Sequence, residues 1–121
     1  MADRPDAFEL AEAVREFLES EVIPALQDPR IKFRALVAGN ALGILGRDLA
    51  LGDALVREEA SLLSGLLGRG GDSRALNEEL CSRIRRGDPP AGTLPALLRI
   101  AGLKLGIASP KYLKAREGAA Q

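Results

Sequence analysis

The segment at residues 37–47, VAGNALGILGR, constrains the fold of this chain most, because it places three glycines in an otherwise apolar helix. Each glycine costs a helix roughly 1 kcal/mol relative to alanine. At about 100° per residue, Gly39, Gly43 and Gly46 fall within about 60° of one another. Such a stripe of small residues lets two helix backbones approach closely. We therefore predict close helix packing at Gly39, Gly43 and Gly46, either within the chain or across a homodimer.

The length of the apolar run does not favour a membrane. Only 12 residues separate Arg34 from Arg47 without a charge, whereas a membrane-spanning helix needs about 20 apolar residues. The N-terminal stretch is charged from its third residue and has no apolar signal core. We expect no membrane contact and a cytoplasmic location.

Two polar residues, Asn40 and Arg47, accompany the glycine stripe. They are seven positions apart, so they lie within about 20° on one helix face. Two interpretations remain open. Neighbouring groups of the protein satisfy both side chains, as is usual for partly buried polar groups, or the pair forms a polar pocket or interface for an anion or an amide.

The rest of the chain predicts an all-α, single-domain bundle of about five helices, mostly antiparallel, with a central apolar second helix. Leucine and alanine, both strong helix formers, dominate, while aromatic residues make up only 3%. Short loops between helices are typical of antiparallel neighbours. The expected helices span residues 5–23, 31–51, 54–67, 73–86 and 93–107. We predict N-caps at Asp3, Asp53 and Thr93, one domain over residues 1–115, and a frayed tail at 116–121.

Composition argues against several classes of function. The 17 basic and 17 acidic residues balance, whereas nucleic-acid binding usually requires a basic excess. The chain has no histidine and one cysteine, which removes the commonest general base and the commonest metal ligands. We expect no metal, no cofactor and no enzymatic activity. We interpret Cys81 as a buried thiol, and the acidic residues Glu16, Glu19, Glu21, Glu58 and Glu59 as solvated helix faces.

Three pieces of the chain, taken in order, resemble a known family. They are RPDAFELAEAVREFLESEVIPAL, FRALVAGNALGILGRDLALG and LKLGIASPKYL, and the most specific part is Asn40 followed by Arg47-Asp48-Leu49. The family comprises small helical bacterial proteins of unknown function. They occur beside, or fused after, aminoglycoside-phosphotransferase-like kinases, often near acyl-CoA dehydrogenase genes. The resemblance implies an accessory role beside such a kinase or dehydrogenase, without catalytic residues to transfer.

Two functional hypotheses follow from the sequence. The first is a helical accessory or interaction protein that forms a homodimer and binds a phosphotransferase-like kinase or an acyl-CoA dehydrogenase. The second is a binding protein for an acyl or phosphorylated metabolite, which Asn40 and Arg47 would contact together with Arg99 or Lys104. An enzyme would have to rely on carboxylates, lysine or tyrosine, and no convergent set of these groups is recognisable.

Overall fold

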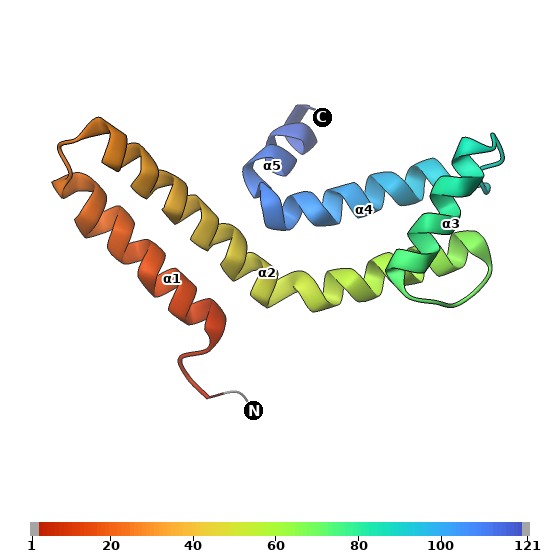
Figure 1. Ribbon diagram of the computed structural model, residues 1–121, viewed down its shortest axis with the longest axis horizontal. Coiled ribbons are helices and arrows are strands. Elements are labelled where there is room, and N and C mark those ends of the chain that lie inside the picture. The colour runs from red at the N-terminus through yellow and green to blue at the C-terminus, as the bar shows by residue number, and fades with distance from the viewer. Residues whose placement is uncertain (1–2, 120–121) are drawn as a thin grey trace. The chain divides into compact units, whose positions relative to one another are not determined.

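The computed structural model describes the backbone of residues 3–119 and the side chains of residues 3–114. Within these residues the protein is all-helical and has no strand. The helices are α1 (Ala7–Phe17), α2 (Pro29–Leu67), α3 (Ser73–Arg85), α4 (Thr93–Ala108) and α5 (Pro110–Ala119) (Figure 1). A π-helical turn (Leu18–Val22) and a 3₁₀ turn (Ile23–Ala25) extend α1. The predicted all-α class, with five helices and a long central one, is confirmed.

None of the three predicted N-caps is found: two are displaced to other residues, and the third, Asp53, lies inside a continuous helix. Helix α1 begins after Asp6 rather than Asp3, because Asp6 and Glu9 form a capping box. The Asp6 carboxylate accepts a hydrogen bond from the Glu9 N–H at 2.8 Å, and the Glu9 carboxylate accepts one from the Asp6 N–H at 3.4 Å. At α4 the N-cap is Gly92, with φ of 86°, and the hydroxyl of Thr93 donates instead to the Pro90 carbonyl at 2.6 Å.

Helix α2 is one continuous helix of 39 residues where the sequence analysis predicted two. The prediction placed a helix end at Gly52 and a new N-cap at Asp53. Gly52 keeps a negative φ, whereas Gly68, the residue that follows α2, has φ of 70°, the left-handed conformation that ends many helices. A single glycine costs only about 1 kcal/mol inside a helix, which the surrounding leucines and alanines outweigh.

The chain divides into two compact units, residues 1–52 and 53–121. In the first unit, α1 and the first half of α2 form an antiparallel hairpin, the red-to-yellow part of Figure 1. Asp28 starts α2 by accepting a hydrogen bond from the Arg30 N–H at 2.9 Å, with Pro29 at the first helical position, where its missing N–H costs nothing. The expectation of one domain over residues 1–115 stays a prediction.

The second unit contains the main hydrophobic core. Leu63 of α2, Leu76 and Leu80 of α3 and Ile100 of α4 are buried together, and partly buried leucines surround them. Pro110 begins α5 directly after the break at Ser109. Helix α5 continues to Ala119, into the segment where we expected a tail.

Candidate functional site

The three glycines of the stripe, Gly39, Gly43 and Gly46 of α2, face α1 and the π-helical turn that extends it. A Cβ atom built on Gly46 would lie 3.3 Å from Cδ2 of Phe8, one built on Gly43 would lie 3.7 Å from Cδ of Arg15, and one built on Gly39 would lie 3.9 Å from Oε1 of Glu19. All three glycines are buried. The contacts run in opposite directions along the two helices, so α1 crosses the stripe antiparallel to α2. The stripe therefore marks a helix contact within the chain.

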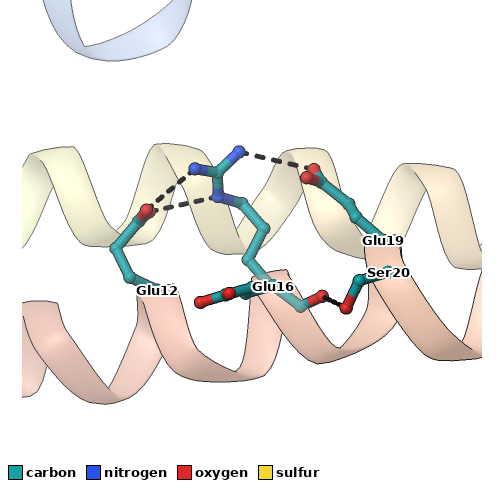
Figure 2. A pocket seen from close by; sticks show the side chains of 5 residues that line it. Glu12, Glu16, Glu19 and Ser20 are labelled. Carbon is teal, nitrogen blue, oxygen red and sulfur yellow. Dashed lines mark hydrogen bonds and ion pairs between the residues drawn. The ribbon is translucent and has the colours of Figure 1, made fainter.

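Charged side chains of α1 and of the π-helical turn form a chain of ion pairs beside this contact. The Arg15 guanidinium donates to Glu12 through Nε at 3.1 Å and Nη2 at 2.8 Å, and to Glu19 through Nη1 at 3.3 Å (Figure 2). The hydrogen bonds from Arg15 hold the pKa of Glu12 below its ordinary value, and the positive charges of Arg15 and Arg47 lower it further. The same bonds to Glu12 raise the pKa of Arg15.

The structure separates the environments of Arg47 and Asn40. Arg47 is half-buried, and its Nη1 lies 3.3 Å from the Cβ position of Gly43. Because its charge acts on Glu12, Arg47 belongs to the charged edge of the hairpin. Asn40 is exposed, and its amide makes no hydrogen bond to any residue that the structure describes. Thus the charge of Arg47 acts on a carboxylate of α1, whereas Asn40 faces solvent.

A shallow, open hollow of about 350 Å³ lies on this charged edge. Its lining comes from α1 and the π-helical turn: Glu12, Arg15, Glu16, Glu19 and Ser20. Ser20 donates to the backbone carbonyl of Glu16 at 2.6 Å (Figure 2). Three carboxylates against one guanidinium make the lining acidic, which disfavours an anionic ligand. The residues that the structure describes include no group of acidic, histidine or cysteine side chains able to hold a metal.

Glu12 and Arg15 are not among the site residues predicted from the sequence. Their spacing indicates the ion pairs, because Arg15 is three residues after Glu12 and four before Glu19. Side chains at these spacings are neighbours on a helix surface. The glycine stripe and the arginine-centred ion pairs thus belong to one helix contact.

Arg99 and Lys104, which the ligand-binding hypothesis included, pair with carboxylates of the second unit. Arg99 Nη2 lies 2.9 Å from Glu58 Oε1, and Lys104 Nζ lies 3.5 Å from Glu59 Oε1. Glu59 also accepts a hydrogen bond from Asn77 at 3.1 Å and is only 7% exposed. The interpretation of Glu59 as a solvated residue is therefore wrong, since α3 and α4 both supply it with donors.

Cys81 is exposed, so its interpretation as a buried thiol is also wrong. Leu76 and Leu80 point into the core from α3. Cys81 follows Leu80 directly, and one residue turns a helix by about 100°. The thiol therefore lies beside the buried stripe and outside it.

The first unit leaves an apolar surface uncovered. Leu10, Val14 and Phe17 of α1 and Leu45 and Leu49 of α2 are each between 47% and 54% exposed. We call these five residues the apolar flank. Among the residues that the structure describes, α2 is the helix whose length and composition would allow it to cross a membrane, and 17% of its most apolar window is buried.

The fold and these surfaces define an all-α protein built from a glycine-packed helical hairpin and a small leucine-cored helical unit. The chain belongs to the family described as "Domain of unknown function (DUF6285)", which matches residues 24–112. The match includes the glycine stripe and begins after α1. Comparison with curated proteins gave no match, and comparison with solved structures gave none. The resemblance to an uncharacterised helical family is thereby confirmed.

Proposed function

We propose that this chain is a non-catalytic helical interaction protein that supports a phosphotransferase-like kinase or an acyl-CoA dehydrogenase in the cytoplasm. The sequence resemblance supports these two partner classes. The structure supports the more general part of the proposal, which is that the protein functions by binding a partner at its surface.

The observation that carries the proposal is the ratio of exposed to buried apolar side chains. The described residues bury eight apolar side chains and expose seventeen large ones. Single exposed leucines are ordinary, but contiguous apolar patches of several hundred Å² mark interaction sites. Twelve of the seventeen belong to the first unit, so the hairpin exposes more large apolar side chains than the second unit and is the part that a partner would cover.

Purification of the protein at its natural abundance tests the proposal. A tagged chain should recover the kinase or the dehydrogenase in a fixed ratio to itself, and adding the purified chain should change the stability or turnover of that enzyme. The chain alone should turn over neither enzyme's substrate. Recovery of the chain without either enzyme, or turnover by the chain alone, would contradict the proposal.

The ligand-binding alternative retains one supporting observation, the exposed amide of Asn40 on the same face of α2 as the half-buried Arg47. The acidic lining of the neighbouring hollow and the pairing of Arg99 and Lys104 with glutamates both weigh against an anionic ligand. Calorimetric titration with coenzyme A and with inorganic phosphate separates the two functions. Saturable binding that Arg47→Ala abolishes would favour the alternative, whereas absence of heat with both probes favours the interaction protein.

The cytoplasmic part of the proposal rests on the charges of α2. Arg47 and Asp48 interrupt its apolar stretch, and charged side chains are costly inside a bilayer. Fractionation of cells should leave the chain in the supernatant after membranes are pelleted. Retention in the pellet after a high-salt wash would contradict this location.

A further inference from the structure

We propose that the apolar flank of the first unit binds a second copy of this chain, so that two hairpins form a four-helix bundle. This inference goes beyond the proposed role beside an enzyme, because it concerns the protein on its own. The surface consists of Leu10, Val14, Phe17, Leu45 and Leu49.

The five side chains lie on one side of the hairpin. At about 100° per residue, Leu10, Val14 and Phe17 fall within about 60° of one another on α1, and Leu45 and Leu49 within about 40° on α2. On α1, Glu12 and Glu16, which line the hollow, lie on the opposite side of the line of contact with α2.

The pairing between the helices places the two stripes together. On α2, Arg47 lies on the side of the glycine stripe away from Leu45 and Leu49. Its Nη1 and the Cδ of Arg15, which pairs with Glu12 of α1, lie 3.3 and 3.7 Å from the same Cβ position at Gly43. The charged edges of both helices therefore coincide. In consequence the two stripes of the apolar flank share the other edge, where the antiparallel crossing brings Val14 level with Leu45 and Leu10 level with Leu49.

The hairpin has almost no core of its own. Among its described residues, Ala11 and Ile23 are the buried apolar ones, because the glycines bring the two backbones together without large side chains between them. Helices need a second layer against which to bury an apolar stripe. A second hairpin supplies two more helices and completes the four-helix arrangement, in which apolar stripes meet at the centre.

The area available suits a dimer. Five half-exposed side chains of this size present on the order of 500 Å² of apolar surface. A standard interface buries about 800 Å² per partner, of which somewhat more than half is apolar. The apolar flank alone therefore supplies the apolar share of a standard interface.

Charge also suits a second copy. None of the five positions is charged, and the basic and acidic residues of the chain balance at 17 each. A chain with net charge near zero does not repel its own copies and tends to associate. A two-fold axis brings the same patch of both copies together, so each exposed leucine contributes to the interface once from each copy.

Sedimentation of the purified full chain with two matched variants tests the inference. Leu45 and Leu51 are both leucines of α2 in the first unit, and both are 49% exposed. They lie about 120° apart around the helix, so only Leu45 belongs to the apolar flank. The test compares Leu45→Glu with Leu51→Glu, after circular dichroism has shown equal helix content.

Wild type and Leu51→Glu should sediment at twice the 12.8 kDa chain mass. Leu45→Glu should raise the dissociation constant at least tenfold, because a two-fold interface would bury two unpaired carboxylates. A wild-type chain that remains single, as it would if its own second unit or a different protein covered the flank, overturns the inference. So does equal dissociation of both variants. Neither result depends on an enzyme partner, because the chain is purified alone.

Discussion

Replacing Gly46 by leucine should destabilise the protein, whereas the same change at Gly65 should not. Both glycines lie inside α2. A Cβ atom on Gly46 would meet Cδ2 and Cε2 of Phe8 at 3.3 and 3.5 Å and Cβ of Ala11 at 3.7 Å. A Cβ atom on Gly65 would meet nothing within 4 Å. The two sites thus share a backbone conformation and differ in what lies beside them.

The magnitudes decide the sign at each site. Leucine is a better helix former than glycine by somewhat under 1 kcal/mol, and at Gly65 this gain stands almost alone. At Gly46 the first added atom already touches Phe8, and three further carbons have no space between the helices. Forcing extra methylene groups into a packed contact costs about 1–3 kcal/mol. We therefore expect Gly65→Leu to raise the free energy of unfolding by up to about 1 kcal/mol, and Gly46→Leu to lower it by about 1–2 kcal/mol.

Urea unfolding followed by circular dichroism measures both changes. Gly46→Ala adds an intermediate case, since Phe8 is 38% exposed and its ring can shift. We expect Gly46→Ala to stabilise the chain less than Gly65→Ala does. If Gly46→Leu is as stable as Gly65→Leu, α1 does not pack on the glycine stripe and the hairpin described above is wrong.

Three further predictions concern the core, a buried carboxylate and pH. Leu63→Ala should cost about 2–5 kcal/mol in urea unfolding because Leu63 is fully buried, while Leu94→Ala, at a position 68% exposed, should change stability by less than about 0.5 kcal/mol. Glu59→Ala should cost about 1–3 kcal/mol because it leaves the part-buried amide of Asn77 without its acceptor, whereas Glu58→Ala removes an exposed pair worth at most about 1 kcal/mol. Similar losses would refute the difference in burial between the two glutamates. Because the pKa of Glu12 is lowered in the folded state, its ionised carboxylate stabilises the fold at pH values above the carboxyl's ordinary pKa, and this contribution disappears as the pH falls through the folded pKa. An NMR titration should find the midpoint for Glu12 below those of exposed glutamates. Glu12→Gln should make the free energy of unfolding fall less steeply as the pH is lowered.

Helix content and the close packing of the stripe followed from local rules, because helix propensity and residue spacing act over a few positions. The start of α1 could also have been found, since Asp6 and Glu9 have the spacing of a capping box. The continuity of α2 could not have been found from the sequence, because the pair Gly52-Asp53 is compatible both with the end of a helix and with a helix that continues. The backbone conformation at Gly52 decides between the two, and the rest of the fold determines that conformation.

In the candidate site, too, some features are predictable from the sequence and others are not. Asn40 and Arg47 share a helix face by spacing alone, yet their environments differ. Arg47 is half-buried because α1 lies beside it and carries Glu12, while Asn40 is exposed. The exposure of Cys81 and the burial of Glu59 likewise depend on which helices pack against α2 and α3, and helix periodicity does not contain that information.

Thiol labelling tests most directly whether two copies meet at the apolar flank. Cys81 is exposed, so the measurement uses Cys81→Ser as background and adds either Leu45→Cys or Leu51→Cys. We predict that the thiol at position 45 reacts slowly at high protein concentration and faster on dilution, as the dimer dissociates. The thiol at position 51 should react at one rate throughout. Fast labelling at position 45 at every concentration, or equal protection at both positions, would contradict the proposed dimer.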